Sequence, residues 1–380
     1  MLRFGLIGLG LIGKAHTAIF ADGKVRGGQL VAVCNRRPPG IDLPDGVRYF
    51  DDVDAMLGAD LVDAVIVATP HPSHLEIGEK VLERGLHLLV EKPLAATKLE
   101  AERLLAIPRR EGQQFGVMFH LRTDPQMRQL RRLVRDGELG EFQRVSWTNT
   151  NWFRSQAYFD AGEWRGTWKH DGGGALMNQA MHNLDLLQWI CGMPTSLRAD
   201  CRFGADHDVE VEDRVTAVLE YPGGASGVFV TTTGEAPGVN RLEIAGTGGL
   251  AVLESGVLTV WRNEIDAREY SKSTNNAFGS PPASREVFPD NDEFTSHAGV
   301  INNFIEAVNG EAPLLADAGE GLHSVELANA MVYSAWTQAP VTLPLDSAAY
   351  QAALAEKIAT SPPRKRKVRE VVLDLEKSYS

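Results

Sequence analysis

Residues 1–16 read MLRFGLIGLGLIGKAH, and this stretch decides the fold of the N-terminal part of the chain. The apolar run Arg3–Ile7 predicts a β-strand rather than part of a signal peptide, and it leads directly into a G-x-G-x-x-G pattern. Such glycines allow a tight turn, close approach of the backbone to a pyrophosphate, and close packing of a helix on the strand. The helix N-terminus then directs its amides at the phosphates. We therefore predict a dinucleotide site, rather than a purely structural turn, at Gly8, Gly10, Leu11, Ile12 and Gly13.

The region up to residue 121 continues the pattern that Arg3–Ile7 begins. Short β-rich runs alternate with helical periodicity, which is typical of a parallel sheet with crossover helices. The clearest helix is Leu75–Arg84, which ends before Gly85. The other predicted strands are Gln29–Val33, Ala64–Ala68, His87–Val90 and Gln114–Phe119. We therefore assign residues 1–121 to a dinucleotide-binding α/β domain with a doubly wound parallel sheet.

A different pattern follows from residue 122 to residue 355. Alternating runs separated by glycine-rich turns predict hairpins and a mostly antiparallel sheet. The predicted strands are Phe142–Thr150, Leu197–Phe203, Arg214–Glu220, Ser226–Thr233, Asn240–Ala245, Gly249–Leu253 and Val257–Trp261. The predicted helices are Pro125–Asp136, Ala175–Ile190, His297–Val308 and Gly319–Trp336. We expect an α+β substrate domain here, with an irregular surface excursion at Asn263–Asp292 and a C-terminal tail at 356–380.

Composition narrows the functional class. The chain has 380 residues, enough for two domains, and 43% of them are hydrophobic. Its net charge of −12 disfavours nucleic acid and anionic membranes as partners. Three cysteines without a CxxC pair argue against a disulfide framework and favour a reducing, cytoplasmic setting. The one basic cluster, Arg364–Lys367 beside Pro362 and Pro363, is interpreted as a solvated linker, with a localisation signal as the alternative.

The end of the second predicted strand bears on cofactor choice. An acidic residue at this point binds the ribose 2′-hydroxyl of NAD, whereas an arginine accommodates the 2′-phosphate of NADP. The sequence here is Cys34-Asn35-Arg36-Arg37, without a carboxylate. Asn35 can bond a ribose, and either arginine can pair with a phosphate. We therefore expect NADP or NAD, with NADP slightly favoured, unless both arginines are merely solvated.

Two further segments follow predicted strands of the parallel sheet. One is Thr69-Pro70-His71 with His74, and the other is Glu91-Lys92-Pro93. Ligands bind at the carboxyl edge of such a sheet, so we expect all of these residues except Pro93 to contact the cofactor. A lysine desolvated there can bond a substrate hydroxyl and lose its proton. His71 and His74 lack a third ligand nearby in sequence, so we predict no metal site, and His74 alternatively caps its helix.

A second cluster of polar side chains lies at residues 168–182, WKHDGGGALMNQAMH. Three glycines lead into the predicted helix, on which Asn178 and His182 are four residues apart and hence on one face. Such a face presents an amide and an imidazole to a sugar hydroxyl. The alternative is a buried pair that satisfies loop carbonyls.

The ordered motifs GLGLIG, ATPHPSH, EKP and GGGALMNQAMHNLDLLQW resemble the glucose–fructose oxidoreductase / inositol dehydrogenase / MocA family over nearly the whole chain. The resemblance implies a Rossmann domain joined to an open-faced, mostly antiparallel sheet that carries the substrate site and, commonly, an oligomer contact. It also implies that Lys92 and His182 lie across the reacting carbon from the nicotinamide. Many members have an aspartate where this chain has Asn178, and an amide orients a substrate but cannot accept a proton.

The predicted reaction is hydride transfer between the nicotinamide and a secondary hydroxyl of a sugar, polyol or sugar derivative. His182 is the expected base, Lys92 polarises the oxygen and shares the proton, and Asn178 orients the substrate. Trp152, Arg154, Trp164 and Lys169 are expected to contact the sugar, with a surface or core role as the alternative for each. We expect a homo-oligomer, a dimer or tetramer. The alternatives are an NAD-dependent glycosidase that oxidises its substrate transiently and a dinucleotide-binding regulator without turnover.

Overall fold

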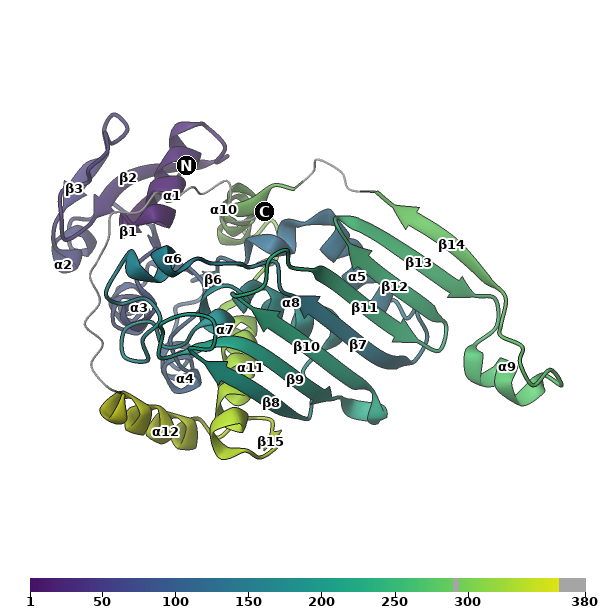
Figure 1. Cartoon of the computed structure of the whole chain (residues 1–380). Helices are drawn as coiled ribbons and strands as arrows, with labels where there is room; N and C mark the ends of the chain where they lie inside the picture. The colour runs from purple at the N-terminus through teal and green to yellow at the C-terminus, as the bar shows by residue number, and fades with distance from the viewer. Residues whose placement is uncertain (290–293, 362–380) are drawn as a thin grey trace. The chain divides into compact units, whose positions relative to one another are not determined.

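The computed structural model describes residues 1–289 and 294–361 (Figure 1). Contacts divide the chain into two compact units. The Rossmann unit comprises Met1–Thr123, His170–Gly172 and Thr295–Val325. The sheet unit comprises Asp124–Lys169, Gly173–Phe294 and the residues from Glu326 onward, less those outside the described ranges. Each unit has its own sheet, and the two sheets share no strand.

The Rossmann unit contains a six-stranded parallel sheet in the order β3-β2-β1-β4-β5-β6. Because β1 lies between β2 and β4, the order reverses there, and this is where such sheets bind ligands. The doubly wound sheet predicted from the sequence is thus confirmed. Its strands are β1 (Leu2–Ile7), β2 (Gly28–Cys34), β3 (Arg48–Phe50), β4 (Ala64–Val67), β5 (His87–Val90) and β6 (Phe115–Val117).

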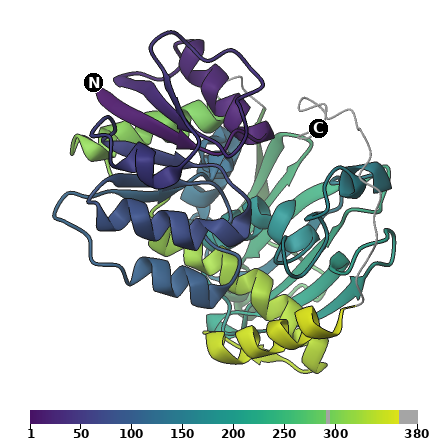
Figure 2. The same ribbon diagram turned by 90° about the vertical axis from the view of Figure 1, so that its left-hand side faces the viewer.

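Helices cover both faces of this sheet. On one face, Phe4 and Leu6 of β1 join a core with α10 (Ser296–Val308) and with residues of α1 (Leu11–Ala21). On the other face lie α2 (Val53–Leu57), α3 (His74–Glu83) and α4 (Lys98–Leu105), and the last two pack side by side (Figure 2). Two 3₁₀ turns, η1 (His71–Ser73) and η2 (His120–Thr123), follow β4 and β6.

Helix α10 differs from the sequence-based expectation. We expected residues 297–308 to complete the second domain, but Val300, Ile301 and Phe304 are buried in the core of the Rossmann unit with Phe4. Apart from the short segment His170–Gly172, the chain therefore returns to this unit only at Thr295, about 170 residues after Thr123. Local periodicity predicts the apolar face of such a helix but not the sheet on which it packs.

The sheet unit contains nine strands in the order β14-β13-β12-β11-β7-β10-β9-β8-β15 (Figure 1). Among the described strands of this sheet, only β7 and β10 pair in parallel, so the expected mostly antiparallel sheet is confirmed. The strands are β7 (Phe142–Asn149), β8 (Ser196–Phe203), β9 (Glu212–Glu220), β10 (Ser226–Thr232), β11 (Asn240–Gly246), β12 (Gly249–Glu254), β13 (Val257–Asn263), β14 (Ala283–Phe288) and β15 (Val341–Thr342).

One face of the nine-stranded sheet is buried and the other is largely exposed. Along β9, buried and exposed residues alternate, and buried Val145, Trp147 and Phe229 extend the inner face to β7 and β10. Helix α5 (Pro125–Arg135) packs against α8 (Met181–Cys191) and β13. The other helices of this part are α6 (Gln156–Asp160), α7 (Ala175–Asn178), α9 (Ala267–Ser273) and α12 (Ser347–Thr360), with the turn η3 (Pro222–Gly224). Helix α11 (Ala318–Thr337) begins in the Rossmann unit and belongs to the sheet unit from Glu326 onward.

Several sequence-based expectations need correction. The span expected as one helix, residues 175–190, is interrupted at Gln179 and Ala180. The excursion expected to be irregular holds α9 and β14. Residues 356–360, expected in the C-terminal tail, form the end of α12. Residues 362–380, with the basic cluster at 364–367, lie outside the described residues.

The described cysteines are all free thiols. Burial, followed by the charges of Asp52 and Asp51, raises the pKa of Cys34 to about 11, and burial raises the pKa of Cys191 to about 12. These thiols are therefore protonated and poorly nucleophilic. Among the described helices, none has both the length and the apolar character that crossing a bilayer requires.

Candidate active site

The glycine turn after β1 leaves room for a ligand at one of its three glycines. Gly8 has a φ of +101°, and a Cβ there would lie 2.6 Å from the carbonyl oxygen of Ala68. A Cβ on Gly13 would lie 2.0 Å from the carbonyl oxygen of Gly8, so α1 packs directly on the turn. Gly10 is exposed, caps α1, and has nothing within 4 Å of the position a Cβ would take. This open space at a helix N-terminus fits a pyrophosphate.

The predicted cofactor residues beside this turn differ in exposure. Leu11 is exposed and Ile12 is half-buried at the start of α1. The Oδ1 atom of Asn35 accepts a hydrogen bond from the Leu9 amide at 3.1 Å, and its Nδ2 donates to the Arg37 carbonyl at 2.7 Å. Asn35 therefore supports the glycine turn. The side chains of Arg36 and Arg37 are exposed at the carboxyl end of β2.

The loop after β4 is tied to the loop after β5 by His74. This side chain is fully buried, with Nδ1 2.8 Å from the Pro93 carbonyl oxygen and Nε2 2.8 Å from the Thr69 carbonyl oxygen. Burial lowers the pKa of His74, although both carbonyls act to raise it. Thr69 is half-buried and Pro70 is exposed, so both are accessible to a ligand. His74 is buried and joins the two loops through its ring nitrogens.

His71 is also largely enclosed. Its Nδ1 lies 3.1 Å from the backbone carbonyl oxygen of Asp171 and 3.8 Å from the carboxylate of the same residue. His71 therefore anchors the segment His170–Gly172 to the Rossmann unit. In the sequence, His71 and Asp171 are separated by 100 residues, so no local pattern predicts this contact.

Lys92 is the second residue after β5, and the carboxylate of the intervening Glu91 holds its backbone. The Oε2 atom of Glu91 accepts a hydrogen bond from the Lys92 amide at 3.2 Å, and Oε1 lies 2.7 Å from Nε2 of His16. His16 is fully buried on α1, the helix that the glycine turn begins. Burial would raise the pKa of Glu91, but His16 and the charges of His297 and Lys92 lower it overall. The carboxylate therefore stays ionised and links α1 to the lysine.

Two further histidines lie near Lys92, and the sequence analysis did not predict either of them as a site residue. The ring of His120, on η2, stacks on that of His297 on α10 with centroids 4.2 Å apart. His297 also contacts the His16 ring edge-on at 5.5 Å. Burial, followed by neighbouring charges that include Lys92, places the pKa of His120 well below its ordinary value. The pKa of His297 falls to about 4 for similar reasons, although Glu91 opposes the shift.

Glycines in the sheet unit shape the turn that leads into α7. A Cβ on Gly174 would lie 2.0 Å from the backbone oxygen of Glu212, and one on Gly173 would meet the Met177 side chain at 2.5 Å. The Glu212 carboxylate oxygen Oε1 accepts hydrogen bonds from the amides of Gly174 and Leu176, at 2.9 and 3.0 Å. A buried carboxylate therefore caps α7 from the first residue of β9.

The relation between Asn178 and His182 differs from the one expected. We placed both on one face of a continuous helix, but α7 ends at Asn178 and α8 begins at Met181. The amide of Ala180 bonds to the Ala175 carbonyl, five residues back, at 2.8 Å. This wider turn breaks the helical repeat, so spacing by four residues no longer sets a shared face. His182 is 4% exposed and Asn178 is half-buried.

Trp152 is held beside the start of α8. Its indole N–H donates to Oδ1 of Asn149, the last residue of β7, and lies 3.3 Å from Oδ1 of Asn183. Asn183 immediately follows His182 in the sequence. The sheet unit therefore brings a predicted sugar-binding tryptophan and the segment with the predicted base together.

Alternating aromatic rings and guanidinium groups extend along the segment 152–165. Arg154 lies over Trp152 at 5.6 Å and over Tyr158 at 5.5 Å. Arg165 lies over the Tyr158 ring at 4.2 Å and over Trp164 at 4.4 Å. Such stacking orients planar guanidinium groups. Three of the four predicted sugar-contacting residues thus lie in this segment, whereas Lys169 is exposed just beyond it.

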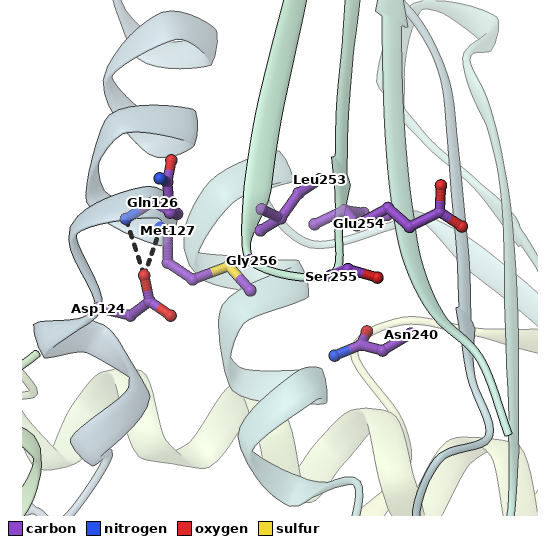
Figure 3. Close-up of a pocket in the computed structure, with 9 residues that line it drawn as sticks. Asp124, Gln126, Met127, Asn240, Leu253, Glu254, Ser255 and Gly256 are labelled. Atoms are coloured by element: carbon purple, nitrogen blue, oxygen red, sulfur yellow. Dashed lines mark hydrogen bonds between the residues drawn. The ribbon is translucent and has the colours of Figure 1, made fainter. Parts of the chain in front are cut away.

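A separate small cavity of about 120 Å³ lies between the N-terminus of α5 and the β12–β13 turn (Figure 3). Asp124 caps α5 there, and Met127 points towards the turn at Ser255 and Gly256. No predicted site residue lines it. Within residues 1–289 and 294–361, no three His, Cys, Asp or Glu side chains are arranged to hold a metal ion.

Both parts of the chain match known sequence families. Residues 2–119 match an oxidoreductase family with an NAD-binding Rossmann fold, and residues 127–252 match the GFO/IDH/MocA C-terminal domain.

Relatives span nearly the whole chain. An inositol 2-dehydrogenase of Rhizobium meliloti is 26% identical over 88% of this chain and 96% of its own length. The D-glucoside 3-dehydrogenase of Escherichia coli is 26% identical over 90% of this chain and 97% of its own length. Among solved structures, the WlbA dehydrogenase of Bordetella pertussis, in complex with NADH and UDP-GlcNAcA, aligns with a TM-score of 0.76. It is 29% identical over 91% of this chain and 98% of its own.

Proposed function

This chain belongs to the GFO/IDH/MocA family of NAD-binding oxidoreductases, and we propose that it transfers a hydride between a nicotinamide cofactor and a secondary hydroxyl of a sugar, polyol or sugar derivative. One chain of contacts in the structure is the main support for placing the reaction at Lys92. The carboxylate of Glu91 accepts a hydrogen bond from the Lys92 amide and also contacts the buried His16 ring. His16 lies on α1, the helix that begins at the glycine turn proposed to bind the cofactor.

The protein's part in the reaction is to move a proton and hold the substrate. During oxidation, His182 takes the hydroxyl proton as main base, while Lys92 polarises the oxygen and shares the proton; during reduction the same groups return it. Asn178 orients the substrate, since its amide cannot accept the proton. A nicotinamide cofactor held at the glycine turn before α1 would supply the hydride acceptor or donor. Burial lowers the pKa values of His120 and His297, so these two neighbours of Lys92 are neutral near pH 7.

The substrate class is inferred from the segment 152–165 and from the relatives. Aromatic faces pack on sugar rings, and guanidinium groups donate to hydroxyls. Trp152, Arg154 and Trp164 offer both kinds of contact within the stacked segment, and Lys169 follows it. The inositol and D-glucoside dehydrogenases among the relatives support a carbohydrate or polyol substrate.

For the cofactor, we propose that Arg36 and Arg37 admit NADP, with NAD as the second cofactor. Both arginines are exposed beside Asn35, and residues 34–37 contain no carboxylate to repel a 2′-phosphate. Replacing both by serine is expected to raise the KM for NADP about tenfold, the scale of one lost charged contact, and to leave the KM for NAD unchanged. A wild-type enzyme that works as well with NAD, or better, would contradict the NADP preference.

The proposed function is tested by an activity assay of the wild-type protein. A panel of sugars, inositols, sugar acids and glycosides is assayed with NAD and with NADP in parallel. Reduced cofactor is followed by its absorbance. We expect turnover of at least one member with net reduction of cofactor. Release of an aglycone without net cofactor change would indicate the glycosidase instead. Tight cofactor binding without any turnover would indicate a regulator.

A further inference from the structure

The loop Gly204–Val211, which joins β8 to β9, is organised around the carboxylate of Asp213. Oδ1 of Asp213 accepts the backbone amide of Ala205 at 3.0 Å, and Oδ2 accepts the amides of Asp206 and His207 at 2.7 and 3.0 Å. The Asp213 side chain is 1% exposed. An ionised carboxylate with this many donors is strongly stabilised, so the loop has a fixed shape.

The His207 ring connects this loop to the segment that carries the predicted sugar contacts. Its Nε2 lies 2.7 Å from the backbone carbonyl oxygen of Arg154, and its Nδ1 lies 3.3 Å from Oδ2 of Asp213. Both neighbours are acceptors, and one of them is the Asp213 carboxylate rather than a second backbone carbonyl as at His74, so its negative charge favours a ring with an N–H on both nitrogens. The ring also packs on Phe159 with centroids 4.7 Å apart, and its side chain is 5% exposed.

Other contacts join the same two segments. The amide of Asp208 donates to the Gln156 side chain at 2.8 Å, and the amide of Glu210 donates to the Gly166 carbonyl at 3.0 Å. Gly166 lies tightly against Val209, because a Cβ on it would approach that side chain to 2.7 Å. The loop 204–211 therefore supports the whole stacked segment, and His207 supports its Trp152–Arg154 end.

We propose that His207 is a positioning residue for substrate recognition, whose imidazolium, anchored on Asp213, holds the Trp152–Arg154 turn in the geometry that receives the sugar. The inference rests on the proposed function, in which this turn contacts the substrate. It adds a residue that touches neither cofactor nor substrate and that acts through the Arg154 carbonyl.

The charges around His207 favour its protonated form. Burial alone would lower its pKa, but the hydrogen bond with Asp213, the Arg154 carbonyl and the charge of Asp206 raise it overall. The Asp206 carboxylate in turn pairs with Arg214 of β9 at 2.7 Å. Asp208 and Glu210 are the remaining charged side chains of the loop. Because the pKa is raised, His207 holds both Asp213 and the Arg154 carbonyl at low and neutral pH, and it loses one of these two hydrogen bonds as the pH rises through that pKa.

The inference predicts a KM for the sugar that rises with pH in the wild-type enzyme. The matched variants are His207→Phe, which keeps the ring against Phe159 without any N–H donor, and His207→Gln, which keeps one donor that does not titrate. We expect His207→Phe to raise the sugar KM about tenfold at every pH, which corresponds to one lost charged hydrogen bond. We expect His207→Gln to show a smaller rise in KM and no pH dependence. The KM for the cofactor should change less than about twofold in both variants, because the Rossmann unit is untouched.

The titration of His207 is followed separately by NMR of its ring carbon, with the resonance assigned from the two variants. This measurement needs no substrate, and a pKa at or below the ordinary value of about 6.5 would overturn the inference. An active wild-type enzyme whose sugar KM is the same in His207→Phe would also overturn it and leave the proposed function standing. A wild-type protein without activity on any sugar would contradict the proposed function itself.

Discussion

The glycines of the G-x-G-x-x-G turn are alike in sequence but not in their surroundings. A Cβ on Gly13 would overlap the Gly8 carbonyl, whereas one on Gly10 would enter open space. The fold therefore needs a glycine at position 13, and the ligand needs one at position 10. The two substitutions to alanine separate these roles.

Gly10→Ala is expected to leave the free energy of unfolding within about 0.5 kcal/mol of wild type and to weaken cofactor binding by at least tenfold, about 1.4 kcal/mol. Gly13→Ala is expected to cost on the order of 3 kcal/mol of stability, because backbone atoms must move. Urea denaturation and titration with NADH and NADPH check both. Normal cofactor affinity in Gly10→Ala would show that the turn does not approach the phosphates.

The histidines of the Rossmann unit predict sensitivity to acid. His74, His120 and His297 have pKa values lowered in the folded state, so the unfolded chain binds protons first as the pH falls below about 6.5. Their stabilising effect is complete above that pH and decreases below it. The lowered pKa of Glu91 makes the protein lose further stability at still lower pH, whereas the raised pKa of His207 acts in the opposite direction.

We therefore expect the free energy of unfolding to fall between about pH 7 and pH 5, by up to about 1.4 kcal/mol per pH unit for each histidine. His120→Phe keeps a ring against His297 but cannot be protonated, so it should reduce the slope. Urea denaturation at several pH values measures this. Stability that is constant or increases on acidification would contradict the assignment of neutral histidines.

At the scale of elements, alternation predicted the strands of the large sheet well, because one face is buried and the other exposed. Three strands were missed for physical reasons. β3 and β15 have only three and two residues, and β14 is an edge strand whose residues are nearly all exposed, so none of them shows a period of two. The break between α7 and α8 contains no Gly or Pro, so no local signal in the sequence marks it.

The capping of α7 by Glu212 gives an element-level prediction. Glu212→Ala leaves two buried amides without their acceptor and should lower the free energy of unfolding by about 3 kcal/mol, whereas Glu212→Gln should cost roughly half as much. Glu220 at the other end of β9 is exposed, with its carboxylate bonded to Ser196 at 2.7 Å, and Glu220→Ala is the control, expected to cost less than about 1 kcal/mol. Equal effects at the two positions, measured by urea denaturation, would contradict the capping role.

At the scale of the whole molecule, the sequence predicted the parts of the site that form locally. The glycine turn, Thr69-Pro70 and Glu91-Lys92 all follow strands of one parallel sheet, so their common edge follows from strand order. His16, Glu91, His120 and His297 meet from four distant segments, and His207 reaches Arg154 across 53 residues. Single-sequence periodicity has no signal for such contacts.

The exposed face of the nine-stranded sheet bears on assembly. Val218 and Val228 are partners in the β9–β10 register, and they are 52% and 38% exposed. We propose that this face binds a second copy of the chain. Light scattering should give the mass of a dimer or tetramer for the wild type, and Val218→Asp with Val228→Asp should shift it towards the monomer, since buried charge disfavours association. A monomeric wild-type protein would contradict this.

The most direct test of the account is the turnover of Lys92→Met with the best sugar from the panel. Methionine keeps an unbranched side chain but can neither polarise the hydroxyl nor share its proton. We predict a fall in kcat of at least about 10²-fold, with cofactor affinity and thermal stability close to those of the wild type. Near-normal turnover by the folded variant would contradict the central claim that Lys92 takes part in hydride transfer.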